Sequence, residues 1–390
     1  MQSSIEKQSD RIVSPKIIQS LCVSVVCVVL VAGLWPFQAP RNNVTWLGKQ
    51  NGLRFGRYGT AVSSNSFRPV ESGNERSCSM EIWLVPGPSH KGTILAFVGA
   101  DDARLSFALR QVGENLAIER YVVDQQGNIT RPWLTIERVF RGGPTFVTVT
   151  SGSHGTLVYI DGVVAKTSAS FGLEREDFAG RLVLATSSIN DSWTGQIFGL
   201  AFYSQELERE QVSRSFHSWT SATALGPAKA EAEPALALYL FNERDGAVVH
   251  NERNPETNLI IPARYLVLHN PFLQPPWEHY RNRWSAAHYW PYWQDAGVNV
   301  AGFMPVGFCF AAYFVSVKRR QHPLRLCVLV GCALSLTIEV LQAFLPTRNS
   351  GMTDLITNTV GTALGGMLYR CSLVQYLWNA ALSPASSSRD

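Results

Sequence analysis

Two kinds of hydrophobic pattern divide this chain. Long apolar runs stand near its two ends, whereas the middle consists of short stretches in which apolar and polar residues alternate. A run of about 20 apolar residues is long enough to cross a bilayer as a helix. Short alternating runs separated by turn residues are typical of antiparallel strands. The pattern therefore predicts a multi-domain membrane protein that combines an all-β sandwich with a four-helix transmembrane bundle.

Four apolar segments are predicted to span the membrane. They cover residues 17–35, 296–317, 324–345 and 352–369. The first also fits a cleaved signal peptide, because a basic start precedes its apolar core. Its length favours an uncleaved anchor, as do Pro36 and Pro40, which stand where a small-residue cleavage site would be expected. Its loss would leave three spans and place the amino terminus outside.

Basic residues flank these segments in a pattern that predicts orientation. They precede the first span, join the second to the third and follow the fourth, as Lys7, Arg11, Lys16, Lys318, Arg319, Arg320, Arg325 and Arg370. Because loops rich in Lys and Arg stay in the cytoplasm, residues 1–16 and 371–390 are predicted to be cytoplasmic. The middle of the chain is then extracytoplasmic, and the protein is expected in the plasma (inner) membrane.

Aromatic residues crowd the segment just before the second span. They are Trp277, Tyr280, Trp284, Tyr289, Trp290, Tyr292 and Trp293. Such rings settle at membrane–water interfaces, so residues 272–295 are predicted to lie along the outer surface. Packing against the soluble domain and an aromatic platform for sugars are the alternatives.

The middle of the chain, residues 45–262, is predicted to form a sandwich of short strands. The strongest local signal is Asp161-Gly162, which stands between two alternating apolar runs and predicts a hairpin. A short helix is expected over Glu206–Phe216. The predicted strands are Ser79–Val85, Thr93–Val98, Leu105–Leu109, Phe146–Thr150, Thr156–Ile160, Val163–Lys166, Arg181–Ala185 and Gln196–Tyr203.

Composition excludes several classes of function. The net charge of +4 comes without a long basic run, so nucleic acid is not an expected partner. Cys78 is alone in the soluble middle, which excludes an internal disulfide there, and no Cys/His spacing predicts zinc. No cofactor is expected.

Acidic residues in the sandwich are also predicted to be ordinary. Hydrolysis of a glucan needs two carboxylates about 5–9 Å apart, and no strand carries such a run. Glu174, Glu176 and Asp177 cluster beside an expected loop and are predicted to form a solvated surface. The pairs Asp101/Asp102 and Asn190/Asp191 fit turns better than a calcium site.

Three segments of the middle resemble laminin-G-like, concanavalin A-type jelly rolls. Thr156–Lys166 (TLVYIDGVVAK) is similar to their central hairpin, Trp193–Ile197 (WTGQI) with Leu200–Tyr203 (LAFY) to their closing strand, and Asn51–Ser64 to an early strand. Leu236–Ile261 resembles an opening segment of such domains but follows the closing strand, so it is expected to add a permuted strand. The resemblance implies a binding module for a glycan or a protein partner.

The third predicted span contains an acid where lipid is expected. Glu339 lies in an otherwise almost wholly apolar segment, and Gln342 shares its helix face. An ionisable group at that depth costs at least ~2.5 kcal/mol on insertion scales, which predicts partners for it. Arg348 lies in the short outer loop that follows.

The second and fourth predicted spans carry matching polar and small residues. Asp354, Asn358, Gly361 and Gly365 fall at i, i+4, i+7 and i+11, which forms one stripe on a helix, and the two glycines allow close helix packing. Asn299 heads the second span, with Pro305 and Gly307 behind it as further packing residues. The predicted topology brings the polar groups together in the outer leaflet.

This arrangement resembles the VanZ-like membrane family. The resemblance rests on Asn299–Gly307 (NVAGFMPVG), on Glu339–Gln342 (EVLQ), and on the spacing of Arg348, Asp354, Asn358 and Gly361. It implies an association with resistance to glycopeptide antibiotics of the teicoplanin kind and leaves the biochemical activity open.

Three functions fit these observations. A non-enzymatic envelope protein would bind a glycan or a partner through the sandwich, and a lipid or lipid-linked glycan at Asn299, Glu339, Gln342, Arg348, Asp354 and Asn358. A membrane-embedded enzyme would use Glu339 or Asp354 as acid or base and Arg348 as an anion clamp. A structural role would use the same groups to hold the helices together, and a transport role would call for a dimer, because four spans are few for a monomeric transporter. The first is favoured, because no nucleophile–base pair is evident and the polar groups lie in the outer leaflet.

Overall fold

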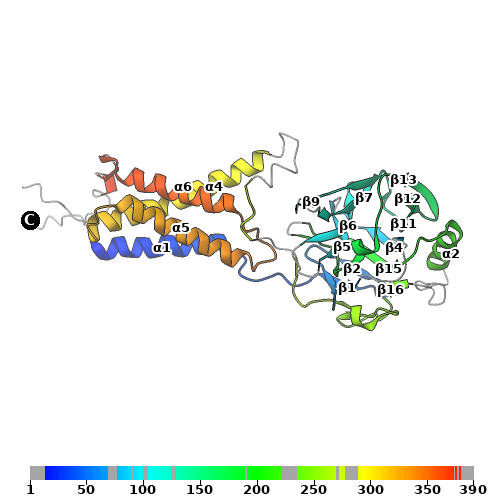
Figure 1. Ribbon diagram of the computed structural model, residues 1–390. Helices are drawn as coiled ribbons and strands as arrows, with labels where there is room; N and C mark the ends of the chain where they lie inside the picture. Colours follow the sequence, from blue (N-terminus) through cyan, green and yellow to red (C-terminus); the bar gives the residue numbers. More distant parts are fainter. Residues whose placement is uncertain are drawn as a thin grey trace, which may run out of the picture. The chain divides into compact units, whose positions relative to one another are not determined.

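The computed structural model divides the chain into two compact units (Figure 1). It describes residues 14–68, 77–88, 91–99, 104–123, 126, 129–188, 191–221, 235–268, 272–276, 289–372, 374–375 and 377–378. One unit comprises residues 1–38 and 271–390 and is helical, and the other comprises residues 39–270 and is built from strands. Each unit is described by itself below.

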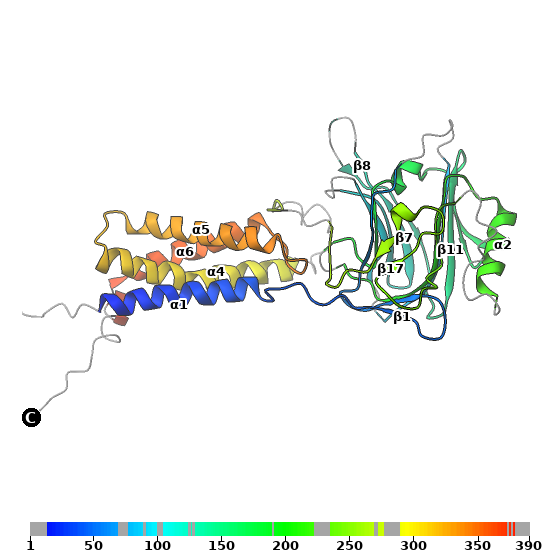
Figure 2. The ribbon, with the colours of Figure 1, turned by 90° about the horizontal axis from the view of Figure 1, so that it is seen from below.

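The strand-built unit is a sandwich of two antiparallel sheets (Figure 2). The first sheet has the order β1 (Val44–Trp46), β2 (Leu53–Phe55), β15 (Gly195–Tyr203), β4 (Cys78–Pro86), β11 (Thr145–Gly152), β12 (Gly155–Ile160) and β13 (Val163–Ser168), with β16 (Ala235–Tyr239) also paired to β15. The second sheet has the order β10 (Trp133–Ile136), β7 (Asn115–Arg120), β6 (Leu105–Val112), β5 (Lys91–Val98), β14 (Arg181–Leu184), β3 (Ala61–Ser63), β18 (Leu259–Ile260) and β17 (Val248–Val249). The small pair β8 (Val122–Val123) and β9 (Ile129–Thr130), and two 3₁₀ turns, η1 (Arg175–Phe178) and η2 (Pro255–Thr257), complete the unit.

Alternating residues of both sheets form one core between them. Phe97 and Phe107 from the second sheet meet Phe202 and Trp193 from the side of the first, and all four are fully buried. Burying one such side chain contributes about 1.5–3 kcal/mol relative to leaving it exposed. The period of two along each strand is what places these residues on the inner faces.

A helix covers the outer face of the first sheet. Helix α2 (Arg209–Thr220) packs Val212 and Trp219 against Phe146 and Tyr203, which point away from the main core. It begins with a capping box in which the Glu208 and Gln211 side chains bind each other's backbone nitrogens, as expected for a helix start. The predicted helix over Glu206–Phe216 therefore forms about three residues later.

The predicted hairpin is present at Asp161-Gly162. Both residues have positive φ, 52° and 76°, as a two-residue turn with strand-matching twist requires. The segment after the closing strand joins both sheets, because β16 pairs with β15 and β18 pairs with β3.

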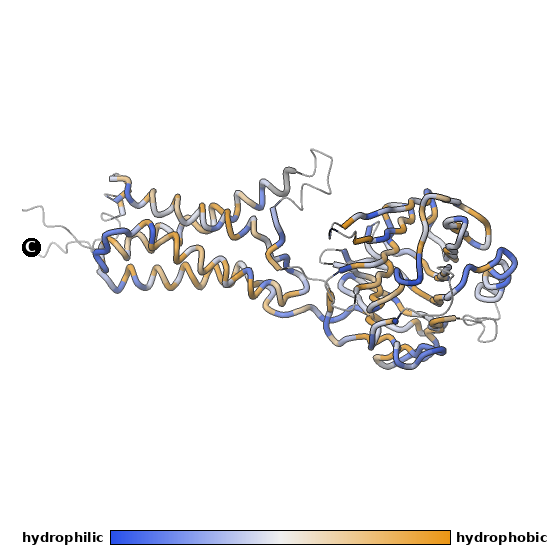
Figure 3. Tube along the Cα trace, in the orientation of Figure 1, coloured by the Kyte–Doolittle hydropathy of each residue, from blue (hydrophilic) through white to orange (hydrophobic). Residues whose placement is uncertain are grey.

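The helical unit contains four long helices that run side by side (Figures 1 and 2). They are α1 (Pro15–Leu34), α4 (Tyr289–Ala312), α5 (Pro323–Gln342) and α6 (Met352–Tyr369), and a π-helical turn, η4 (Tyr313–Val317), continues α4. Within the described residues three segments are long and apolar enough to cross a membrane, namely Pro15–Leu34, Trp293–Val317 and Pro323–Gln342. Figure 3 shows the apolar residues distributed along these helices. Helix α6 forms where a fourth span was predicted but is not among the three.

Two helix ends differ from prediction. Helix α4 begins at Tyr289, so residues 289–295 are helical and continuous with the second predicted span. The aromatic residues 277–288 lie outside the described residues. Helix α5 ends at Gln342 instead of Leu345, because the residue before a proline disfavours helical backbone and Pro346 follows.

Candidate functional site

Two of the predicted site residues hold the end of α1. The side-chain nitrogen of Gln342 donates to the carbonyl of Gly33 at 2.7 Å. Arg348 donates from both Nε, at 3.0 Å, and Nη2 to the carbonyl of Trp35. The last carbonyls of a helix have no partner within it, so these two side chains act as caps for α1.

Glu339 instead binds the segment that leads into α6. It is buried on α5, and its Oε2 accepts the backbone N–H of Gly351 at 2.8 Å. Its side chain also forms a hydrogen bond with that of Ser350. A carboxylate near the first turn of a helix is favourable for the helix dipole, so Glu339 supports the start of α6.

The remaining polar residues pair across helices. Asn299 on α4 donates from Nδ2 to Oδ1 of Asp354 on α6 at 2.9 Å. One turn further along α6, Asn358 donates from Nδ2 to the hydroxyl of Ser335 on α5 at 2.9 Å. Interhelical hydrogen bonds of this kind contribute on average about 0.6 kcal/mol each in membranes.

Glycines form the contact between α4 and α6. A Cβ atom at Gly361 would overlap the carbonyl of Val300, and one at Gly365 would overlap that of Met304. Gly307 faces the backbone of α6 in the same way. Pro305, predicted to belong to this packing group, is exposed on α4 and lies outside the contact.

The six predicted polar residues make three sets of contacts, and Glu339 of one set lies close enough to Asp354 of another to interact with it electrostatically. One set caps α1, one supports the start of α6, and one joins α6 to α4 and α5. Two buried acceptors nevertheless lack a hydrogen-bond partner within the described part of the chain, namely Oε1 of Gln342 and Oδ1 of Asn358. These residues are only 8% and 5% exposed, and a buried polar atom without a partner costs about 1–3 kcal/mol. Such atoms are expected to meet a ligand or a water molecule.

A second polar cluster lies on the outer face of the second sheet. Glu119 on β7 is its centre: Oε2 accepts hydrogen bonds from the Tyr121 hydroxyl, at 3.0 Å, and from Arg131. Arg110 on β6 lies 3.8 Å from the other oxygen and also donates to Asp191 at 2.7 Å. Burial, together with the neighbouring Glu119 carboxylate, raises the pKa of Tyr121, so its hydroxyl remains a proton donor.

The strand row through this cluster also holds two buried alanines and an exposed tryptophan. The strand register places Trp133, Glu119, Ala108 and Ala96 in one row across β10, β7, β6 and β5. The alanines have no exposed surface, whereas Trp133 is 69% exposed. We call the surface formed by Trp133, Glu119, Arg131, Tyr121 and Arg110 the tryptophan face.

Two acidic residues predicted to be ordinary surface or turn residues are in fact buried in ion pairs. Asp177 binds Arg120 at 2.8 Å, and Glu174 binds the same arginine at 2.9 Å. Asp191 binds Arg110 and accepts the hydroxyl hydrogen bonds of Thr93 and Ser187. Burial is the largest influence on Asp177 and raises its pKa, although Arg120 opposes the shift. Within the described residues no group of three or more His, Cys, Asp or Glu side chains fits a metal ion, and Asp101, Asp102 and Asn190 lie outside them.

The tryptophan face is not predicted from the sequence, because neither β7 nor β10 is among the predicted strands. The signal available in the sequence was the run Trp133–Ile136 (WLTI), in which apolar and polar residues do not alternate because the exposed Trp133 is itself apolar. With only four residues it is too short to stand out.

Comparison with known proteins identifies the two regions separately. The family model described as VanZ/LLP1 matches residues 235–375. The model described as concanavalin A-like lectin/glucanases superfamily matches residues 56–213. A comparison with curated proteins finds no match.

Solved structures with some similarity come from several sources. The receptor binding domain of botulinum neurotoxin D is 14% identical, with a TM-score of 0.35 over 46% of this chain and 47% of that one. A putative carbohydrate binding protein from Bacteroides ovatus is 14% identical, with a TM-score of 0.36 over 55% and 58%. A heptameric SAP-like pentraxin from Limulus polyphemus is 14% identical, with a TM-score of 0.35 over 57% and 96%. The chain spans about half the length of the toxin domain it matches.

Proposed function

We propose that this chain is an integral membrane protein that binds a glycan through its sandwich, because residues 235–375 match the VanZ/LLP1 model and residues 56–213 match the concanavalin A-like lectin/glucanases model. The tryptophan face is the proposed binding surface. The protein acts as a non-enzymatic binding module held at the membrane by its helices.

The observation that carries this proposal is the exposed Trp133 beside a fixed set of polar groups. An aromatic ring offers a flat apolar surface against which the apolar face of a sugar ring can lie. The neighbouring Glu119, Arg131 and Tyr121 provide acceptors and donors for sugar hydroxyls. Their mutual hydrogen bonds hold them in place before a ligand arrives, which reduces the entropy lost on binding.

The charges of this surface favour a neutral glycan. Two arginines, Arg110 and Arg131, are balanced by two carboxylates, Glu119 and Asp191, within one connected network. No net charge is therefore left over to select an anion. A ligand rich in hydroxyl groups matches the set better than a phosphate or a carboxylate does.

The proposed orientation places the sandwich outside the cytoplasm. Ile18, Ala312, Cys327 and Tyr369 pack in one cluster, so the first end of α1, the last of α4, the first of α5 and the last of α6 lie together. The basic residues predicted to be cytoplasmic flank this end. If all four helices cross the membrane, the positive-inside rule then puts residues 39–270 on the outer side.

The direct test is equilibrium binding of the full-length protein, purified in detergent, to an array of neutral and acidic glycans. The proposal expects saturable binding to one or more neutral glycans. Absence of binding to every glycan, with the sandwich folded, would contradict it. Binding confined to sialylated or sulfated glycans would contradict the neutral assignment.

A second candidate function is the binding of a lipid or a lipid-linked glycan by the polar end of the helical unit. The buried, unpartnered acceptors of Gln342 and Asn358 favour it. Both would accept hydrogen bonds from a headgroup that carries hydroxyl or ammonium donors. Native mass spectrometry of the wild type beside Asn358→Leu tests this function, because a bound lipid that disappears in the variant supports it and an unchanged lipid complement contradicts it.

A further inference from the structure

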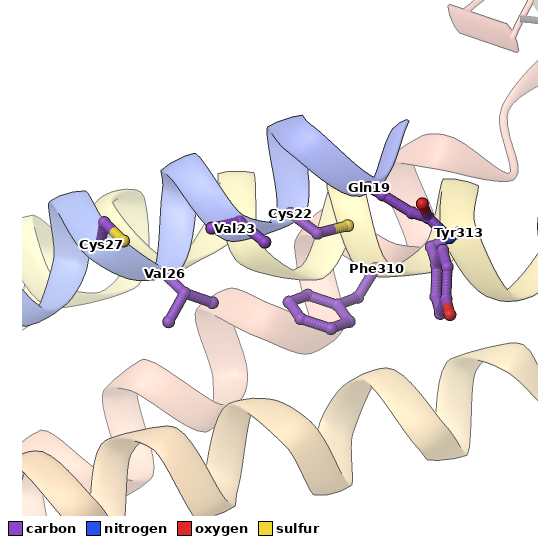
Figure 4. Close-up of a pocket in the computed structure, with 7 residues that line it drawn as sticks. All are labelled: Gln19, Cys22, Val23, Val26, Cys27, Phe310 and Tyr313. Atoms are coloured by element: carbon purple, nitrogen blue, oxygen red, sulfur yellow. The ribbon is translucent and has the colours of Figure 1, made fainter. Parts of the chain in front are cut away.

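We propose that the helical unit holds an anionic phospholipid in a groove between α1 and the end of α4, away from the polar residues discussed above. The groove has a volume of about 530 Å³ and is lined by seven residues (Figure 4). They are Gln19, Cys22, Val23, Val26, Cys27, Phe310 and Tyr313. The inference does not depend on the proposed glycan binding.

The lining of the groove suits an acyl chain. Four of the seven lining residues are valines or cysteines on α1, and Phe310 on α4 adds an aromatic wall. From Gln19 to Cys27 the groove follows α1 for about 12 Å, which is most of the ~15 Å thickness of one leaflet. Val23 is 63% exposed, so the groove is open to the surroundings of the bundle and not sealed within it.

A local departure from α-helix places a cation at one end of this groove. Residues 313–317 form a π-helical turn, and the backbone N–H of Lys318 donates to the carbonyl of Tyr313 at 3.0 Å. In a π-turn the backbone hydrogen bond joins residue i+5 to residue i, which brings Lys318 next to Tyr313. The Lys318 ammonium lies 5.9 Å from the centre of the Tyr313 ring. Tyr313 itself lines the groove, so Lys318 is positioned at its mouth.

A second cation approaches the same mouth from α1. Lys16 is three residues before Gln19, so the two share a helix face, and Gln19 lines the groove. Both lysines are exposed and belong to the basic end of the bundle. An apolar groove with two lysines close to one end matches an acyl chain joined to an anionic headgroup. A basic residue near an anionic membrane surface raises the affinity for such lipids about five-fold.

The test is native mass spectrometry of the full-length protein in detergent, titrated with phosphatidylglycerol or with phosphatidylcholine of the same chains. The proposal expects preferential retention of phosphatidylglycerol. Lys318→Gln should reduce that retention about five-fold and leave phosphatidylcholine unchanged. Val23→Trp, which fills the groove, should reduce the binding of both lipids.

Arg325→Gln is the matched control, because Arg325 is exposed at the same basic end of the bundle but is not part of the groove lining. It should leave both lipids unaffected. Equal retention of the two lipids by the wild type would overturn the proposal. An effect of Arg325→Gln as large as that of Lys318→Gln would also overturn it, because the preference would then come from the general charge of that end. Unchanged binding by Val23→Trp would remove the groove as the site.

Discussion

Oxygen Oε2 of Glu339 lies 2.8 Å from the backbone nitrogen of Gly351, across the turn that separates α5 from α6. An acid within a predicted membrane span thus has a structural partner next to it. The bond ties the last turn of α5 to the start of α6, and Asp354 follows three residues later. Glu339 therefore supports the position of the polar residues on α6 whether or not a lipid binds there.

This contact predicts different effects for two substitutions at Glu339. Glu339→Gln keeps an oxygen that accepts the N–H of Gly351, so its melting temperature in detergent should stay close to that of the wild type. Glu339→Ala leaves that N–H without its partner, which costs about 1–3 kcal/mol, and should lower the melting temperature by several degrees. Equal destabilisation by both variants would show that the charge matters and the acceptor does not.

Because Gln342 and Arg348 cap α1, the stability of the helical unit is expected to depend on both side chains. Arg348→Met removes both donors to the Trp35 carbonyl, and Gln342→Leu removes the donor to Gly33. Each should cost about 1 kcal/mol, and the double variant should lose roughly the sum, because the two caps serve different carbonyls. Thermal unfolding in detergent measures the loss. Arg370→Met, an exposed cation at the other end of the bundle, should have no effect, and an equal loss from this control would contradict the capping role.

The glycine contact between α4 and α6 predicts a sharp difference between two Gly→Ala substitutions. Gly365→Ala places a methyl group onto the carbonyl of Met304, so the two helices must separate, at a cost of about 1–3 kcal/mol. Gly302→Ala on α4 meets no atom within 4 Å, and alanine favours a helix over glycine by up to about 1 kcal/mol. Gly302→Ala should therefore be neutral or stabilising in the same unfolding measurement. A Gly365→Ala variant as stable as Gly302→Ala would show that the close approach is not needed.

Glu81 predicts a pH dependence in the sandwich. It is fully buried on β4, where Oε2 accepts the Tyr203 hydroxyl at 2.7 Å, and burial raises its pKa from 4.5 to about 7. The folded state thus binds a proton that the unfolded state releases between pH 4.5 and 7, so stability falls as pH rises through this range. The full contribution is about 3 kcal/mol.

Glu81→Gln should remove this dependence. As the pH rises from 4.5 to 7, the wild type should lose unfolding free energy relative to the variant. Above about pH 7 the difference between the two should be constant. Denaturant unfolding of the full chain at several pH values measures it. A difference that does not change with pH would mean that Glu81 keeps its ordinary pKa.

Local sequence signals predicted many elements of the sandwich. The burial of two acidic residues was not predicted, because it depends on long-range contacts. Asp161-Gly162 defines its hairpin by backbone preference alone, and the alternation in Ser79–Val85 marks a long central strand. Asp177 and Asp191 were misjudged because their partners, Arg120 and Arg110, are 57 and 81 residues away in the sequence. The residues around a turn do not indicate that a carboxylate there will be buried against an arginine far away in the sequence.

In the helical unit, helical spacing identified the polar residues but not their partners. The i, i+4 spacing of Asp354 and Asn358 correctly placed both on α6, yet Asp354 binds α4 and Asn358 binds α5. The backbone carbonyls that Gln342 and Arg348 cap carry no sequence signal. Spacing along a helix therefore identified these residues but did not specify which element each of them would bind.

The measurement that tests the central claim most directly is the affinity of the full-length protein for its best neutral glycan, compared across Trp133→Ala, Trp133→Phe and the wild type. Trp133 is mostly exposed, so neither substitution should unfold the sandwich. Trp133→Ala removes the ring and should weaken binding by about 1–2 kcal/mol, which is a roughly five- to thirty-fold increase in Kd. Trp133→Phe keeps an aromatic ring and should lose less affinity. An unchanged Kd for Trp133→Ala would contradict binding at the tryptophan face.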